Sequence, residues 1–283
     1  MTSVLYDAPG PRARALNRVL TLVGVALVAG VVAFVVWRLQ SALQLTASKW
    51  SVFTYADIQR ALFRAWWATM KIALVAIALS VVLGAVLAAL RLSTVRALRL
   101  PATVLVQFLR APPVLLMMFW FFYGARGAVP VFWCGVLGLT LYNGAIIAEI
   151  LRAGVRALPA GQREAGLAVG LTPSQVTWTI LLPQALRSML PSLLAQVVVI
   201  LKDTALIYIL GYSELLRWGT GLGTQYFNLV PATIVIAVVY IATNSVVAAA
   251  AKVLERRLST TSRATRTAAM PGAPAQVESG SAV

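Results

Sequence analysis

Long apolar runs alternate with short polar segments along most of this chain. A run of about 18 apolar residues or more favours a membrane-spanning helix over the buried helix of a soluble domain. Several runs approach or exceed that length, and basic residues lie at their ends. The pattern predicts six spanning helices, at residues 19–38, 66–90, 103–123, 131–151, 192–212 and 230–252.

The first apolar run, Val19 to Trp37, follows three arginines between residues 12 and 18, and so shares the order of a secretory signal peptide. It is longer than the roughly 7–15 apolar residues of such a peptide, and no small-x-small cleavage site follows it. We therefore interpret this run as a retained first span.

Two segments outside the predicted spans differ in composition. Residues 39–65 mix polar and charged residues with aromatics, which predicts an external loop with an interfacial helix near Ile58 to Trp66. From Ser259 onward, Ser, Thr, Ala, Pro and Gly dominate without an apolar period, which predicts a disordered cytoplasmic tail. The predicted parts are an N-terminal arm with the first span and external loop, a core of the remaining spans and the tail, at residues 1–60, 61–258 and 259–283.

Composition and charge support the same class. The chain is 60% hydrophobic and 11% charged, whereas soluble domains have about 45–50% and about 25%. We therefore expect an all-α, polytopic protein in a lipid bilayer. Of the 24 Lys and Arg residues, 16 fall on one side of the predicted spans and seven on the other. The positive-inside rule makes the majority side cytoplasmic, with both termini and the loop 152–191 on it.

The basic balance and the missing residue types exclude several functions. The net charge of +16 would suggest nucleic acid in a soluble protein, but here it orients spans, so we expect no nucleic-acid partner. One cysteine and no histidine rule out disulfide frameworks, Cys/His metal sites and Cys–His or Ser–His catalysis. No Gly-Lys dipeptide occurs, so the chain lacks a Walker A loop. We expect no catalytic residue, metal or cofactor in this chain.

The loop 152–191 begins with the signals of a short helix. We expect that helix to open near Glu164, since an acidic side chain in the first turn is favoured by the helix dipole. Gly170 is well placed to end it in a left-handed conformation.

A second helix is predicted directly afterwards. Thr172 and Gln175 have the spacing of a capping box, and Pro173 would occupy the first helical position. This helix should end or bend before Pro183, because proline has no N–H to donate. A plain connector between two spans is the alternative interpretation of the whole loop.

The order of residues in this loop resembles the EAA loop of permeases from binding-protein-dependent ABC importers. The resemblance rests on Glu164-Ala165-Gly166, with Gly in the place of the family's second Ala, on Gly170, and on Ile180-Leu-Leu-Pro183. Gly166 is still small, although it could loosen the first turn. The similarity extends over residues 61–258 and includes Arg110-Ala-Pro-Pro113, Tyr142-Asn-Gly with Glu149 and Gly154, and Leu201 to Leu206.

This resemblance implies a transport subunit of a bacterial inner membrane and not an enzyme. A second permease, taken to be a different chain, would complete the pore, and an extracellular solute-binding protein would deliver an amino acid. A cytoplasmic ABC ATPase dimer would bind ATP and Mg²⁺ and receive the coupling loop, with Glu164 as an anchor and Gly170 as a hinge of close approach. The residues implied in coupling are Glu164, Ala165, Gly166, Gly170 and Pro183.

Charged and polar residues inside the predicted spans are the candidates for the substrate path. Lys202 and Asp203 fall at the middle of the span 192–212. Charged side chains at that depth are costly and indicate a functional role, but each could instead pair with a polar group on a neighbouring helix. Glu149 has the i,i+3 spacing of a local ion pair with Arg152. The amide of Asn143, near the middle of the fourth span, could line a cavity. The candidates are Asn143, Glu149, Lys202, Asp203 and Thr204.

Further resemblances concern the substrate. The opening Tyr6 to Pro11 and the blocks that begin at Tyr142 and Thr177 resemble the second permease of actinobacterial glutamate-uptake systems. Glutamate is therefore the expected substrate, with glutamine, aspartate or a basic amino acid as alternatives.

An anionic amino acid needs cationic groups along its path, and Lys202 would be one of them. Arg126 and Arg217 would favour its arrival at the outer face. A secondary transporter is less favoured, because the chain has few spans and no inverted repeat. An enzyme would need a polar cluster, yet only Glu149 and Asp203 of the eight acidic residues fall within predicted spans. A channel filter repeat is also absent.

Overall fold

The structure, a computed structural model, describes residues 10–268, and its regular elements over that range are all helices. The all-α fold is therefore confirmed. The elements are α1 (Pro11–Ser41), α2 (Ala47–Trp50), the 3-10 helix η1 (Ser51–Thr54), α3 (Ala56–Leu92), α4 (Arg96–Arg110), α5 (Val114–Gly124), α6 (Val131–Arg156), α7 (Ala160–Ala168), α8 (Pro173–Gln175), the π-helix η2 (Val176–Leu181), α9 (Leu182–Asp203), the 3-10 helix η3 (Thr204–Leu210), α10 (Leu215–Gln225) and α11 (Leu229–Ala268).

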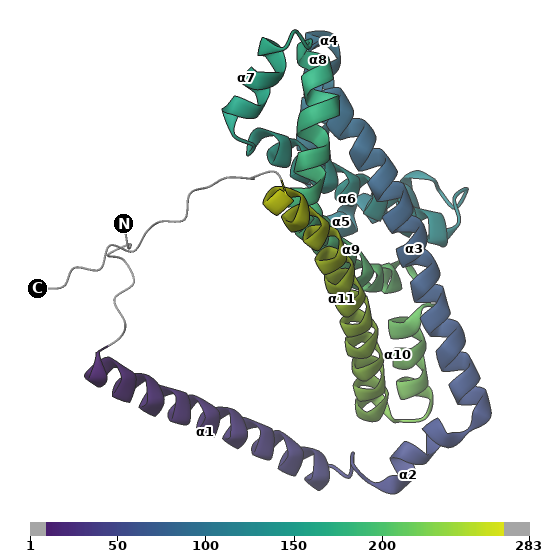
Figure 1. The fold of residues 1–283 in the computed structure, drawn as a ribbon. Coiled ribbons are helices and arrows are strands. Elements are labelled where there is room, and N and C mark those ends of the chain that lie inside the picture. The colour runs from purple at the N-terminus through teal and green to yellow at the C-terminus, as the bar shows by residue number, and fades with distance from the viewer. Residues whose placement is uncertain (1–9, 269–283) are drawn as a thin grey trace, which may run out of the picture.

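The sequence predicted six spans. Five helices of the described chain are long and apolar enough to cross a membrane, and a sixth span results if α4 and α5 count as one. Figure 1 shows α7 and α8 at the end of the bundle where α3 finishes and α4 begins. We call this the loop end.

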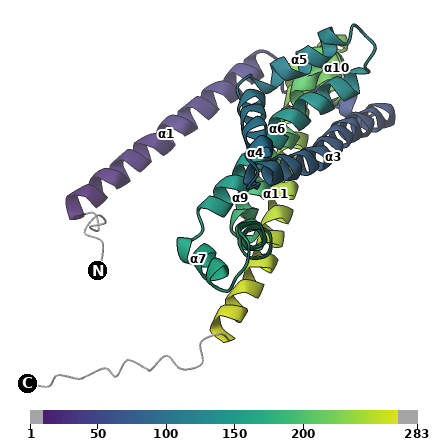
Figure 2. The ribbon, with the colours of Figure 1, turned by 90° about the horizontal axis from the view of Figure 1, so that it is seen from above.

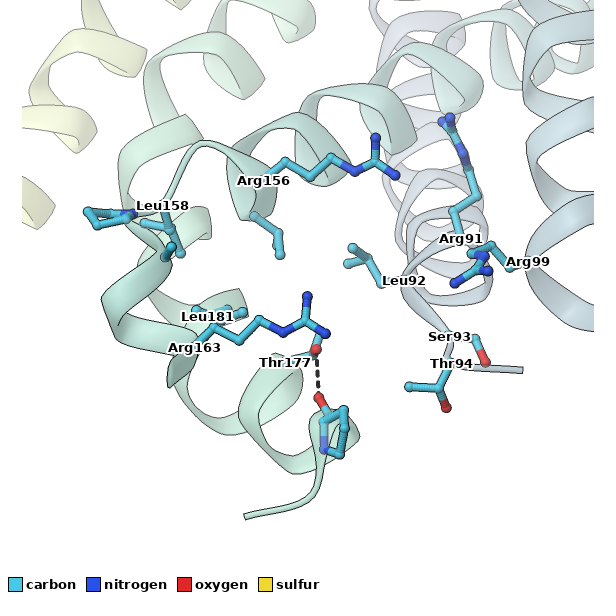
Figure 3. A pocket seen from close by; sticks show the side chains of 14 residues that line it. Arg91, Leu92, Ser93, Thr94, Arg99, Arg156, Leu158, Arg163, Thr177 and Leu181 are labelled. Atoms are coloured by element: carbon cyan, nitrogen blue, oxygen red, sulfur yellow. Dashed lines mark hydrogen bonds between the residues drawn. The ribbon is translucent and has the colours of Figure 1, made fainter. Parts of the chain in front are cut away.

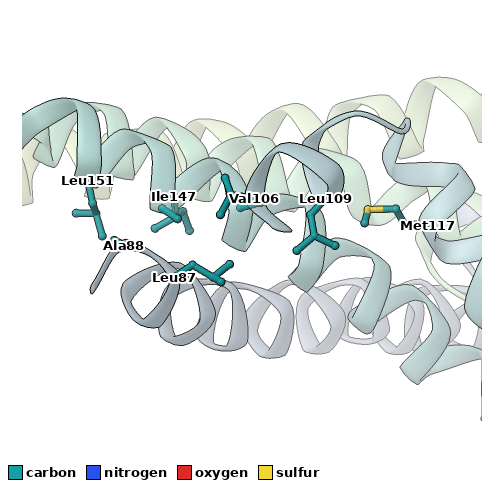
Figure 4. Packing of buried hydrophobic residues seen from close by; sticks show 9 residues of the cluster. Leu87, Ala88, Val106, Leu109, Met117, Ile147 and Leu151 are labelled. Carbon is teal, nitrogen blue, oxygen red and sulfur yellow. The ribbon is translucent and has the colours of Figure 1, made fainter. Parts of the chain in front are cut away.

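The bundle is centred on α3 and α6, which lie side by side. A methyl group at Gly84 would lie 2.5 Å from Cγ2 of Ile147, so the small residue permits this close approach. Close packing of this kind holds helices together in lipid, where water exclusion contributes little. Figure 4 shows the cluster that joins α3, α4, α5 and α6, which includes Leu87, Ala88, Val106, Leu109, Met117, Ile147 and Leu151.

The third predicted span, 103–123, is broken in the structure. α4 and α5 meet at an angle of 95° across a short break. The break falls at Pro112 and Pro113, and Pro113 has an extended ψ of 141°. Two consecutive prolines remove two N–H donors and push the preceding backbone out of the helical region. The predicted span 103–123 is therefore not one straight helix but a pair of helices.

The predicted interfacial helix near Ile58 to Trp66 is the beginning of α3. This helix starts at Ala56 and has 37 residues. At 1.5 Å per residue, a helix of that size is about 55 Å long, well beyond the roughly 30 Å of a bilayer core. Its first turns therefore extend past the apolar layer and need no separate helix.

The two ends of the chain differ from the bundle. α1 has no buried residue and stands apart from the other helices in Figures 1 and 2. α11 continues to Ala268, so residues 259–268 of the predicted disordered tail are helical. The remainder of that predicted tail, 269–283, lies outside the described residues, as does 1–9.

Candidate functional site

The helix α7 begins earlier than the sequence predicted. Its first residue is Ala160, so Glu164 lies in the second turn, and the first turn contains no acidic residue. Pro159 precedes the helix with an extended ψ of 136°, and this proline, not the acid, sets the start. Glu164 is exposed to solvent.

The end of α7 is the one predicted. Gly170 has a φ of +86°, a left-handed conformation that L side chains adopt at a cost. Its N–H donates to the carbonyl of Leu167 over 3.0 Å, and the N–H of Leu171 donates to the carbonyl of Gly166 over 3.2 Å. These two bonds form a Schellman motif. The left-handed stop at Gly170 is confirmed.

The capping box is also confirmed. The N–H of Gln175 donates to Oγ1 of Thr172 over 3.4 Å, and the N–H of Thr172 donates to Oε1 of Gln175 over 2.8 Å. Pro173 occupies the start of the helix, as predicted. The direction of the chain after α7 is therefore fixed by local hydrogen bonds.

The helix does not end before Pro183. Residues Val176–Leu181 widen into the π-helix η2, and α9 follows with Pro183 in its first turn. In a regular helix the proline ring clashes with the carbonyl four residues earlier, and a π turn relieves such a clash. A local widening thus replaces the predicted end.

Gly166 lets α7 pack against η2. It is buried, and a methyl group there would lie 2.8 Å from Cγ2 of Val176 and 3.1 Å from Cδ1 of Ile180. The side-chain amide of Gln184 donates to Oε1 of Gln162 over 3.1 Å and links α9 to α7. A small residue at this position is therefore a packing requirement of the loop.

The outer face of the same loop carries exposed apolar side chains. Leu167 is 40% exposed, Val169 78% and Trp178 45%. Ala165 and Pro183 are also exposed. These residues lie at the loop end beyond the helix bundle, where a protein partner can cover them.

Glu149 is the centre of a larger charge cluster than the sequence predicted. Its pair with Arg152 is present. Oε2 of Glu149 also accepts from Nη1 of Arg91 over 2.6 Å and lies 3.4 Å from Nη1 of Arg110. The side chain of Arg91 is only 2% exposed. One carboxylate therefore ties α3, α4 and α6 together at the loop end of the membrane region.

Asn143 is buried between α6 and α9. Its amide donates to the carbonyl of Leu139 over 2.9 Å, and Oδ1 accepts from Nε2 of Gln196 over 2.6 Å. Its role on a substrate path stays a prediction, since in this chain its polar atoms are engaged in packing.

Lys202 and Asp203 lie where α9 turns into η3. Lys202 is exposed and Asp203 half-buried, and neither side chain has a hydrogen bond or ion pair within residues 10–256. Over that range the predicted pairing of these side chains with a neighbouring helix is absent. Thr204 is buried, and its hydroxyl donates to the carbonyl of Leu201 over 2.7 Å. The cluster of Glu149 and the pair Lys202–Asp203 are not brought together by any contact in the described chain.

Glu214 is a buried carboxylate that sequence reasoning placed in an external loop. It is fully buried and caps α10 by accepting from the N–H of Arg217 over 2.8 Å. The hydroxyls of Tyr240 and Thr69 donate to its Oε2 over 2.8 Å and 3.3 Å. An acid three residues after the turn at Gly211 was the available signal, but the glycine-rich sequence of α10 concealed that helix. The described residues contain no group of three His, Cys, Asp or Glu that could hold a metal.

Comparisons with known proteins place this fold. Residues 80–260 match the family of binding-protein-dependent transport system inner membrane components. The glutamate transport system permease protein GluD of Corynebacterium glutamicum is 40% identical over 76% of this chain and 81% of its own length. The glutamate/aspartate import permease protein GltK of Escherichia coli is 33% identical over 56% and 75%.

A solved structure shares the architecture. The crystal structure of an amino acid ABC transporter with histidines superposes with a TM-score of 0.69 at 25% identity, and it covers 75% of this chain and 100% of the matched chain. The family match spans both the helix bundle and the loop with the capped helices. This chain is a member of the family of binding-protein-dependent transport system inner membrane components.

Proposed function

We propose that this chain is the permease subunit of an ABC importer that carries glutamate across the inner membrane. A partner ATPase dimer binds ATP and Mg²⁺ and supplies the energy. A solute-binding protein delivers the amino acid, and a second, different permease completes the path. The permease relatives named above support the transport role, and two of them are named for glutamate.

The proposed coupling to the ATPase rests on the ordered conformation of the loop 152–191. α7 packs against η2 at Gly166, and the Schellman motif at Gly170 fixes the end of the helix. Leu167 in its last turn and Val169 directly after it are exposed to solvent. A rigid short helix with exposed apolar side chains at its end suits docking into a groove of another protein. In this proposal the groove belongs to the ATPase, and Glu164 lies beside the contact.

The orientation follows from the same arrangement. Basic residues crowd the loop end, among them Arg96, Arg163 and Arg187, which favours a cytoplasmic location for that end and for both termini. A cysteine at Ser174, in a chain lacking Cys134, should react with an impermeant thiol reagent only from the cytoplasmic side. Labelling from outside would overturn this orientation.

The substrate is tested by uptake of labelled amino acids. Cells that carry the gene, with its partners intact, should take up glutamate, and cells that lack it should lose most of that uptake. Relatives that match at 27–28% identity are named for arginine and glutamine, so these amino acids belong in the same assay. A deletion that spares glutamate and aspartate uptake but abolishes that of arginine or lysine would sink the glutamate assignment.

A further inference from the structure

A cavity of about 370 Å³ opens at the loop end, beside the coupling loop. It lies between the turn that joins α3 to α4, the end of α6 and the start of α7. Small-molecule sites have volumes of roughly 300–1,000 Å³, so this cavity is large enough for a headgroup-sized ligand. Figure 3 shows side chains from these separate elements around one open space.

Four arginines from four helices line this cavity: Arg91, Arg99, Arg156 and Arg163. No Asp or Glu of the described chain is among the lining residues. Arg91 is paired with Glu149, but the other three arginines have no carboxylate within ion-pair distance among residues 10–256. In Figure 3 the guanidinium groups of Arg99, Arg156 and Arg163 extend toward the central space. Like charges held around one cavity repel each other, and a bound anion relieves that repulsion.

Neutral hydrogen-bond donors complete the lining. The Ser93 hydroxyl accepts from the N–H of Val95 over 3.1 Å and keeps its own proton to donate. Thr94 has no hydrogen bond within the described residues. The lining thus offers many donors and few acceptors, which favours an oxyanion over a neutral or cationic ligand.

The geometry favours phosphate over a carboxylate. Guanidinium groups reach the cavity from several sides, which suits a group with three acceptor oxygens better than one with two. The cavity lies at the ends of membrane-spanning helices, where lipid headgroups lie, and basic pockets at that depth bind anionic headgroups. We propose that this cavity binds a phosphate group, supplied by an anionic phospholipid headgroup or by a free phosphate compound.

The test measures thermal unfolding and retained lipid for the full chain in nanodiscs. Phosphatidylglycerol mixed into phosphatidylcholine should raise the unfolding midpoint by several degrees and should remain bound in native mass spectrometry. The double variant Arg156→Gln/Arg163→Gln should lose most of this shift, with binding weaker by about tenfold or more, because two charge-assisted hydrogen bonds are removed. Both arginines are exposed, so the variant should still fold; Arg99→Gln alone provides a second variant.

The matched control is Arg96→Gln/Arg187→Gln, which removes the same charge from exposed positions outside the cavity. It should keep the full shift of the unfolding midpoint.

A second arm of the experiment titrates inorganic phosphate into phosphatidylcholine nanodiscs. A variant-sensitive shift in that arm assigns a free phosphate compound, and one confined to phosphatidylglycerol assigns the lipid. Equal responses of the two double variants in both arms, or a shift produced by glutamate but by neither phosphate source, would overturn the proposal. Because transport is not measured, this result is independent of the proposed substrate.

Discussion

Two carboxylates in the membrane region, Glu149 and Asp203, have opposite surroundings. Glu149 contacts three arginines from three helices, and one of those arginines is almost completely buried. The side chains of Asp203 and its neighbour Lys202 have no hydrogen bond or ion pair among residues 10–256. An unpaired charge is costly in lipid, and a paired one is held by its partners. The charge of Glu149 is therefore balanced within this chain. Asp203 and Lys202 require another molecule as a partner for their charges.

From this difference we propose that Glu149 has a structural role and that Lys202 and Asp203 have a functional one. A carboxylate that joins α3, α4 and α6 belongs to the fold of the subunit. A charged pair at the α9–η3 junction, with Lys202 on the surface, requires water, substrate or the second permease for its stabilisation. The comparison thus predicts that changes at the two sites fail in different assays.

Replacing Glu149 should have the largest effect on stability. Glu149→Gln leaves the buried guanidinium of Arg91 without its counter-charge, and breaking such a pair costs about 3–5 kcal/mol. The purified chain should unfold at clearly lower temperature or denaturant concentration, and expression should fall.

The control is Asp57→Asn, which removes an equivalent contact with Arg60 on the exposed start of α3. This variant should be indistinguishable from the wild type, because exposed pairs contribute little. A loss no greater at Glu149 than at Asp57 would remove the structural side of the comparison.

Glu214 adds a third case to the comparison, because this buried carboxylate accepts hydrogen bonds from a backbone N–H and hydroxyl groups and contacts no cationic side chain within ion-pair distance among the described residues. Glu214→Ala strands the hydroxyl of Tyr240 and the N–H of Arg217, and two unsatisfied groups cost roughly 2–4 kcal/mol together. Tyr240→Phe removes only one donor and should cost about 1 kcal/mol. Chemical unfolding of the two variants checks the order; an equal loss would show that the carboxylate network is not what holds α10.

Changes at the second site should leave the isolated chain nearly as stable as the wild type. We expect Lys202→Met and Asp203→Asn to change the free energy of unfolding by less than about 1 kcal/mol, since neither breaks a contact within the chain. Uptake by the assembled transporter should nevertheless fall by about tenfold or more, the factor of one lost interaction of about 1.4 kcal/mol. Wild-type uptake in both variants would contradict a role of Lys202 and Asp203 in transport.

Much of the loop could be predicted because its signals are local. The capping box at Thr172 and the glycine stop at Gly170 depend on neighbouring residues only, and both are present. The start of α7 was missed because the acid at Glu164 was given more weight than Pro159. The break at Pro112 and Pro113 had a visible signal as well, but the apolar run on either side concealed it.

The charge clusters were harder to predict because their partners are distant in sequence. Arg91 and Glu149 are 58 residues apart, and Thr69 and Glu214 are 145 apart. Hydropathy assigns residues to spans but does not say which faces meet. The pair Glu149–Arg152 was predicted because an i,i+3 spacing on a helix brings two residues together by itself.

The coupling role of the loop is tested most directly by glutamate-stimulated ATP hydrolysis in liposomes that contain the whole transporter. Gly170→Asp places a side chain at a φ of +86°, where L residues are strained, and adds bulk at the loop end. Gly161→Asp adds the same side chain at an exposed, open position inside α7 without a positive φ. The account predicts that Gly170→Asp inserts normally but loses the stimulation, whereas Gly161→Asp keeps it. Full stimulation and normal uptake in Gly170→Asp would contradict the account.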